Sequence, residues 1–201
     1  MGLGKTLQTI ALLLSNPPEG RDGIKAYPYK RPTGRGPKAP RCTLIVSPVS
    51  VMANWMMEID KFVNKHTKVL NVAIYQGSKR EEELIKVKRH QVDVLICSYQ
   101  TLAADFKKYD EYQVAMEEDD KSRQPAAKKA KEDPDAEYTP GPERQKKKQW
   151  PETWIYKMLF HRIVLDEAHI IRNGESQTFN AISNLVAIHK LCLTGTPFVS
   201  G

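Results

Sequence analysis

The chain has 201 residues and a formal net charge of +7, and 40% of its residues are hydrophobic, which suits one ordinary domain with a sizeable core. No run of about 18 apolar residues is present, so the sequence predicts no membrane span, and its first residues lack the basic-then-apolar pattern of a signal peptide. The cysteines Cys42, Cys97 and Cys192 have neither zinc-ligand nor disulfide-framework spacing. We therefore expect buried thiols in an intracellular protein.

Most of the positive charge lies in one stretch. Residues 17–41 contain seven Lys and Arg against two acidic residues, a net charge of +5, which leaves +2 for the rest of the chain. The stretch is also rich in Pro and Gly and poor in aliphatic residues, a composition typical of a mobile loop. The excess charge therefore says little about a DNA-binding face on the folded core.

Short apolar stretches alternate with segments of helical spacing along the chain. The expected helices cover residues 5–15, 51–63, 81–90 and 176–187. The expected strands cover residues 42–48, 69–75, 92–99, the run that ends at Asp166, and 190–196. This alternation predicts an α/β fold with a parallel sheet.

Residues 105–150 differ in composition from the rest of the chain. An acidic cluster at 117–120 is followed by basic clusters at 128–131 and 144–148. Such a tract buries too little apolar area to offset the entropy of ordering it, so we expect a disordered insertion. The basic clusters have the form of nuclear-import signals, and a merely solvated run of charges is the alternative.

Asp166 and Glu167 directly follow the apolar run 163–165. Such a run is typical of a buried parallel strand, and these strands present their chemistry at their carboxyl ends, where a metal-bound phosphate fits. Two solvated acids at the end of a surface strand are the alternative that this stretch leaves open by itself.

The chain opens with Met1-Gly2-Leu3-Gly4-Lys5-Thr6. A loop of small residues before Lys-Thr at a helix start binds phosphate through backbone N–H groups and the positive helix end. In that pattern Lys5 reaches the outer phosphates and the Thr6 hydroxyl binds Mg²⁺. A chance glycine loop is the alternative, and its pairing with the two carboxylates argues against it. The complete pattern needs another small residue and a strand ahead of Met1, so we expect the first strand of the fold to be missing.

The paired motifs predict roles for three side chains. Asp166 would hold Mg²⁺, usually through water, and Glu167 would orient or deprotonate the attacking water. Both roles depend on positioning and charge, which dominate phosphoryl-transfer catalysis. His169 lies near enough to link the site to the next strand, and a histidine that is merely hydrogen-bonded at the strand end is the alternative.

Six motifs occur in an order typical of a known family. They are Gly2–Thr6, Ser47-Pro48 with Asn54-Trp55 and Glu58, Tyr75-Gln76-Gly77, Asp93–Tyr99, Asp166–His169 with Arg172-Asn173, and Leu193–Pro197. The series resembles the first RecA-like lobe of the SWI/SNF-type double-stranded-DNA translocases of helicase superfamily two, and the Pro-rich loop is similar to that of the fungal, repair-linked branch. This resemblance implies a RecA-like P-loop NTPase lobe with helices on both faces of the sheet, and ATP and Mg²⁺ as ligands.

The resemblance also implies roles for individual residues. ATP binding is implied for Gly2, Leu3, Gly4, Lys5 and Thr6, and catalysis for Lys5, Asp166 and Glu167. A role in coupling the nucleotide state to DNA binding is implied for His169, Thr194, Gly195 and Thr196. Contact with the DNA backbone is implied for Ser47, Pro48, Ser98 and Tyr99. Ordinary strand-end loops are the alternative for this last group, and Trp55 is interpreted as a core anchor of its helix.

In the family a second RecA-like lobe supplies an arginine that completes the site, and the missing strand is expected between the strand of Asp166 and the strand of the coupling motif. We therefore expect a truncated lobe that is inactive by itself. The implied partners are double-stranded DNA, the second lobe, and nucleosomes or repair proteins, with no membrane, and the implied location is the nucleus. The alternative is a catalytically inactive fragment that serves as a DNA- or protein-interaction module.

Overall fold

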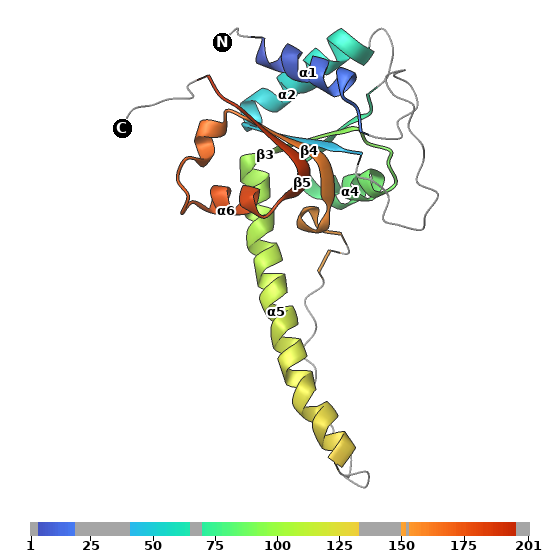
Figure 1. Ribbon diagram of the computed structural model, residues 1–201, viewed down its shortest axis with the longest axis vertical. Coiled ribbons are helices and arrows are strands. Elements are labelled where there is room, and N and C mark those ends of the chain that lie inside the picture. Colours follow the sequence, from blue (N-terminus) through green and yellow to red (C-terminus); the bar gives the residue numbers. More distant parts are fainter. Residues whose placement is uncertain (1–3, 19–40, 65–69, 133–149, 152, 196–201) are drawn as a thin grey trace.

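Five parallel strands form one sheet in the order β2-β3-β1-β4-β5 (Figure 1). The strands are β1 (Thr43–Ser47), β2 (Val72–Tyr75), β3 (Val94–Ser98), β4 (Leu159–Asp166) and β5 (Val186–Leu193). The computed structural model describes residues 4–18, 41–64, 70–132, 150–151 and 153–195. The predicted α/β fold with a parallel sheet is confirmed.

Helices cover both faces of the sheet, as expected (Figure 1). On one face lie α1 (Lys5–Ser15) and α2 (Val49–Ile59), which continues into the π-helix η1 (Asp60–Asn64). On the other face lie α4 (Arg80–Lys88), α5 (Tyr99–Glu132) and α6 (Gln177–Ser183). Short 3-10 helices are η2 (Gly77–Lys79), η3 (Ile155–Lys157) and η4 (Ala168–Ile171). None of the helices described is long and apolar enough to cross a bilayer.

The central strands are buried on both faces, which explains why their sequences are continuously apolar. Every residue of β1 and β3 is buried, and side chains alternate along each strand between the α1–α2 core and the α4–α5–α6 core. The register pairs Ser47 with Ser98 and Val46 with Leu165. The carboxyl ends of β1, β3 and β4 therefore meet at one edge of the sheet, where Asp166 ends its strand.

The structure contradicts the position that the sequence predicted for the first strand of the fold. β4 and β5 pair directly with each other, from Leu159 with Val186 to Asp166 with Leu193. This continuous register leaves no room for another strand between the Asp166 strand and the coupling-motif strand. β5 also begins at Val186, earlier than the predicted residue 190.

β5 forms an edge of the sheet, since no strand in the described part of the chain pairs with its outer side. Its side chains are only partly covered, and Val186 and Ile188 are more than half exposed. The expectation of three buried thiols is therefore wrong for Cys192, which lies on β5 and is exposed, whereas Cys42 and Cys97 are buried.

The expected disorder of residues 105–150 is wrong for their first part, because α5 is a helix as far as Glu132. Figure 1 shows this helix projecting from the sheet as a long arm. Phe106, Tyr109 and Tyr112 recur at helical spacing and pack against aromatic residues that precede β4, with ring centroids 5.3 to 5.8 Å apart. This packing offsets the cost of ordering the first turns of α5. Residues 133–149, with the second basic cluster, lie outside the described residues, as do most of 17–41.

Candidate functional site

α1 begins beside the carboxyl edge of the sheet. Gly4 precedes its first residue with a φ of +66°, a left-handed conformation that favours glycine. Lys5 and Thr6 then form the first turn and are half-buried, and the free N–H groups of this turn give it a positive end. Gly2 and Leu3 lie outside the described residues, so their predicted ATP binding stays a prediction.

The structure brings Lys5 and Glu167 together, although 162 positions separate them in the chain. Lys5 Nζ lies 3.0 Å from Glu167 Oε1, and His169 Nδ1 lies 3.2 Å from Glu167 Oε2. Glu167 has a φ of 51°, a left-handed backbone that is uncommon for a residue with a side chain. Such strained positions cluster at functional sites. Three of the predicted site residues therefore form one cluster of polar side chains.

The coupling motif lies next to this cluster. A Cβ atom added to Gly195 would sit 3.8 Å from Lys5 Nζ, so the segment after β5 passes close to the lysine. Thr194 is half-buried at the end of β5, and Thr196 lies outside the described residues. A phosphate bound by Lys5 would therefore lie beside Gly195, as a coupling role requires.

Asp166 is buried and held by protein donors. Its side chain is 6% exposed, Oδ2 accepts a hydrogen bond from Trp55 Nε1 at 3.0 Å, and Oδ1 accepts one from the Glu167 N–H at 3.0 Å. Tyr99 Oη donates to the Asp166 carbonyl oxygen at 2.8 Å. Burial, and next the charge of Asp166, raise the pKa of the Tyr99 phenol, which keeps this donor protonated. The carboxylate is thus oriented before any ligand binds.

Trp55 and Tyr99 were not predicted to support Asp166. Trp55 is 1% exposed, which agrees with its interpretation as a core anchor, but its N–H also orients the carboxylate. One signal in the sequence pointed this way: a tryptophan on a buried helix needs an acceptor for its indole N–H. The sequence did not show which acceptor that was.

The predicted DNA contacts require a correction. The side chains of Ser47, Ser98 and Tyr99 are at most 1% exposed, so their side chains do not reach a DNA phosphate in this structure. Ser98 instead caps α5, since its Oγ accepts a hydrogen bond from the Thr101 N–H at 3.1 Å. Pro48 is half-buried at the start of α2, and its contact with DNA stays a prediction.

The donor set of the site fits a magnesium-bound triphosphate. Among the residues with described positions, no group of three or more His, Cys, Asp or Glu could hold a metal by itself. Mg²⁺ is usually held by one or two protein oxygens together with waters and substrate phosphates, and Asp166 and the Thr6 hydroxyl are suitable. Each Asp166 oxygen keeps an acceptor position, because a carboxylate oxygen accepts more than one hydrogen bond.

Comparisons with known proteins agree with this geometry. The profile of the SNF2-related domain family matches residues 1–201. The chain is 31% identical over 204 residues to the DNA repair protein rad5 of Emericella nidulans. This alignment covers 100% of this chain and 14% of that protein. It is also 31% identical over 200 residues to the ATP-dependent helicase rhp16 of Schizosaccharomyces pombe, covering 98% of this chain and 16% of that protein.

Among solved structures, the SWI2/SNF2 ATPase core of Sulfolobus solfataricus in complex with dsDNA has a similar fold. Its TM-score is 0.52 at 22% sequence identity, and the match covers 98% of this chain and 26% of that chain. The predicted RecA-like fold and the similarity to fungal repair ATPases are thus confirmed. The chain spans about one seventh of the length of the relatives named above.

Proposed function

The chain belongs to the SNF2-related domain family, and from that premise we propose that it is the nucleotide-binding lobe of an ATP-dependent double-stranded-DNA translocase. The observation that carries this proposal is the contact of Lys5 with Glu167 beside the oriented Asp166. A lysine at a helix start and two strand-end carboxylates are the protein groups that a magnesium-bound triphosphate needs. Chromatin remodelling or DNA repair, in the nucleus, is the proposed setting.

Lys5 exchanges partners in the proposed mechanism. Without nucleotide its ammonium pairs with Glu167; with nucleotide it moves to the outer phosphates, whose charge it partly neutralises. Glu167 is then free to accept a proton from, or to orient, the attacking water. Asp166 and Thr6 would hold Mg²⁺, which would supply further charge stabilisation when bound. His169, paired with Glu167, and Gly195, beside Lys5, are positioned to report this exchange to the rest of the lobe.

Duplex DNA is the proposed binding partner, because the structure of the similar Sulfolobus solfataricus core is a complex with dsDNA. The exposed residues that follow β1 and β3, Val49, Ser50 and Gln100, lie at the same edge of the sheet as Lys5 and Asp166. We propose that these segments and Pro48 contact the phosphate backbone, which gives binding without sequence preference.

We further propose that the polypeptide 1–201 hydrolyses ATP slowly by itself. Phosphoryl transfer requires positive charge on both sides of the transferred group, and arginine fingers contribute roughly 10³–10⁵ in rate. In the described part of the site Lys5 provides one side. Arg172 is exposed at the end of η4 and follows Glu167 too closely to reach the opposite side.

An ATPase assay of 1–201 with and without duplex DNA and a titration with a fluorescent ATP analogue, each beside Lys5→Ala, test these proposals. We expect measurable Mg·ATP binding and turnover close to background. Turnover that rises with duplex DNA and disappears in Lys5→Ala would show that the lobe is self-sufficient. Failure to bind Mg·ATP at all would overturn the nucleotide-site assignment and support the alternative, an inactive DNA- or protein-interaction module.

A further inference from the structure

β2 is the second edge strand of the sheet, and its outer side is unpaired within the described chain. The backbone direction of one residue fixes that of the others. The Asn71 carbonyl oxygen accepts from the Asp93 and Val94 N–H groups at 2.8 and 3.1 Å, and the Asn71 N–H donates to Asp93 Oδ2 at 2.8 Å. Asn71 therefore directs both of its backbone groups towards β3.

Successive residues of a strand direct their backbone groups to alternate sides. Ala73 and Tyr75 consequently share the direction of Asn71 and bond within the sheet. Val72 and Ile74 direct their N–H and C=O groups outward, where no described strand receives them. β2 thus presents a short row of donors and acceptors that another extended chain could complete.

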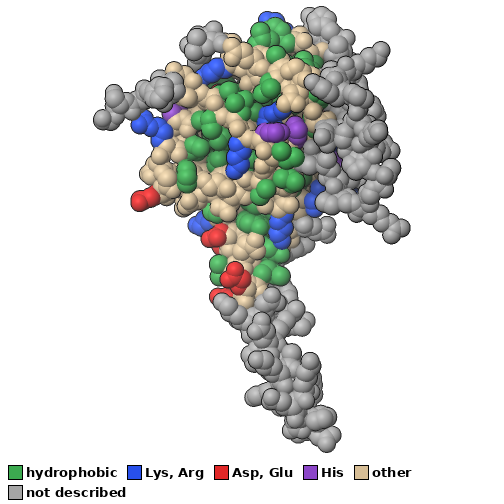
Figure 2. Space-filling view, viewed as in Figure 1, with side chains coloured by type: hydrophobic (Ala, Val, Ile, Leu, Met, Phe, Trp, Pro, Cys, Tyr) green, Lys and Arg blue, Asp and Glu red, His purple; other side chains and the backbone are tan. Residues whose placement is uncertain are grey.

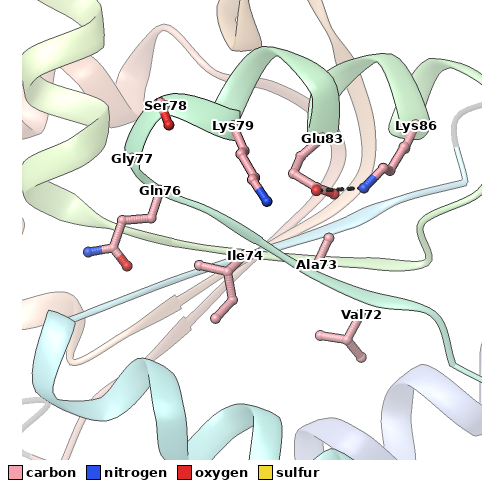
Figure 3. A pocket seen from close by; sticks show the side chains of 9 residues that line it. All are labelled: Val72, Ala73, Ile74, Gln76, Gly77, Ser78, Lys79, Glu83 and Lys86. Carbon is pink, nitrogen blue, oxygen red and sulfur yellow. Dashed lines mark hydrogen bonds and ion pairs between the residues drawn. The ribbon is translucent and has the colours of Figure 1, made fainter.

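A groove of about 680 Å³ runs along this edge, between β2 and the η2–α4 segment (Figure 3). Figure 3 shows the side chains of Val72 and Ile74 on the side of β2 that faces away from α4. There they are partly buried and pack against the α1–α2 core. An occupant of the groove would meet backbone groups along the strand and an apolar surface on one side.

The wall formed by η2 and α4 carries charge. Glu83 and Lys86 line the groove and pair with each other, with Lys86 Nζ 2.7 Å from Glu83 Oε1. Lys79 also lines the groove, is exposed, and makes no ion pair within the described part of the chain. The groove is therefore left with one uncompensated positive charge.

We propose that this groove binds an extended acidic peptide segment of a partner protein, which adds to the sheet as a strand beside β2. Main-chain hydrogen bonds to Val72 and Ile74 would supply affinity, as in other cases of strand addition. Because side chains of a strand alternate, the segment needs acidic residues facing Lys79 and apolar residues on the opposite face, near Val72 and Ile74. None of the residues that line the groove belongs to the nucleotide site.

Amide hydrogen exchange of 1–201, measured by NMR with the peptide acetyl-Val-Glu-Val-Glu-Val-Glu-amide, tests the proposal. We expect the amides of Val72 and Ile74 to exchange fast in the free protein and slowly in the complex. The amides of Ala73 and Tyr75, already bonded within the sheet, should change little. Unchanged exchange at Val72 and Ile74 with excess peptide would overturn strand addition.

Charge changes in the protein and in the peptide test whether the occupant is acidic. Lys79→Glu should weaken binding of the acidic peptide by roughly fivefold or more, because it replaces an attraction between exposed charges with a repulsion. Lys107→Glu, an exposed lysine on α5, is the matched control and should bind as the parent does. Equal binding of acetyl-Val-Lys-Val-Lys-Val-Lys-amide, or full binding by Lys79→Glu, would contradict the assignment of an acidic partner.

Discussion

Glu167 is the residue on which the resting site depends, because two basic side chains contact it at once. Lys5 Nζ contacts one of its oxygens and His169 Nδ1 the other. The Lys5 and Glu167 side chains are 27% and 35% exposed, and an ion pair so accessible to water is worth about 1 kcal/mol or less. Phosphates of an incoming nucleotide can therefore displace Glu167 from Lys5 at small cost.

Glu167→Gln should bind Mg·ATP up to about fivefold more tightly than the parent, because it frees Lys5 from a competing charge. The same variant should show no hydrolysis in any assembly that supports turnover by the parent. A titration with a fluorescent ATP analogue measures the affinity. Glu175→Gln, an exposed acid in the loop after η4, is the control; an unchanged or weaker affinity in Glu167→Gln would contradict the partner exchange.

The hydrogen bond from Trp55 to Asp166 should contribute to both stability and metal binding. Trp55→Phe retains most of the buried ring but removes the donor, and loss of a hydrogen bond to a charged group costs about 1–3 kcal/mol. A double-mutant cycle with Asp166→Asn, read from urea unfolding, separates this bond from packing. We expect the cost of Trp55→Phe to shrink in the Asp166→Asn background. Strictly additive costs would mean that the charge of Asp166 adds nothing to this hydrogen bond, because Asn keeps an acceptor oxygen.

The residues proposed to act on the nucleotide were predictable from the sequence. The residues that orient them were not. Lys5, Asp166 and Glu167 lie at a helix start and a strand end, positions that local patterns reveal. The contact of Trp55 with Asp166 spans 111 positions and depends on how α2 crosses the sheet. Tyr99 was expected at the DNA and instead supports Asp166, because local sequence does not show whether a strand-end side chain points inward.

At the scale of elements, β4 carries two buried basic residues on the same strand that ends at Asp166. His161 and Arg162 are buried, and neither His161 Nε2 nor Arg162 Nη1 has a hydrogen-bond partner among the described residues. Arg162 Nη2 donates to the Asn16 carbonyl oxygen just after α1, and the ring of His161 packs edge-to-face with His189 of β5. Burial, with smaller effects of Arg162 and His189, lowers the pKa of His161 to about 4.

This lowered pKa makes the stability of the lobe sensitive to acid. Between about pH 6.5 and pH 4 the unfolded chain protonates His161 while the folded chain does not, so the free energy of unfolding falls as the pH falls. The loss attributable to His161 approaches about 3 kcal/mol and ends below pH 4. Urea unfolding of the parent and of His161→Gln, with His169→Gln as an exposed control, measures it. Equal pH dependence of the parent and His161→Gln would contradict this explanation.

Element types were predictable where the apolar pattern was strong, as in β1 and β3. α5 was missed because its high charge outweighed the spacing of Phe106, Tyr109 and Tyr112, the aromatic residues that anchor it. The start of β5 was missed because Val186 and Ala187 were assigned to the preceding helix, and a short apolar run does not by itself distinguish a strand from a helix. Both errors concern elements whose order depends on packing partners far away in the sequence.

At the scale of the whole molecule, β5 leaves apolar surface exposed. Val186 and Ile188 are 53% and 54% exposed on this edge strand, and Figure 2 shows hydrophobic side chains at the surface of the face that β5 and α6 form in Figure 1. An unpaired edge with apolar side chains is a template for association with another chain.

The polypeptide 1–201 should therefore self-associate as its concentration rises, and Ile188→Lys should reduce this. A charge on an edge strand opposes edge-to-edge pairing, and the substituted side chain is 54% exposed. Sedimentation velocity over a range of concentrations measures the effect. Met57→Lys, which changes a similarly exposed apolar residue on α2, is the control. Association that is equally reduced by Met57→Lys, or that is absent in the parent, would contradict a role for the β5 edge.

The central claim, a nucleotide site formed by Lys5, Asp166 and Glu167, is tested most directly by Mg·ATP binding to 1–201 and to Lys5→Ala. The parent should bind a fluorescent ATP analogue saturably and only with Mg²⁺ present. Lys5→Ala should bind at least about tenfold more weakly, because it loses a charge-assisted hydrogen bond to phosphate, while Lys107→Ala should bind as the parent does. Equal affinity of the parent and Lys5→Ala, or binding that ignores Mg²⁺, would contradict the account.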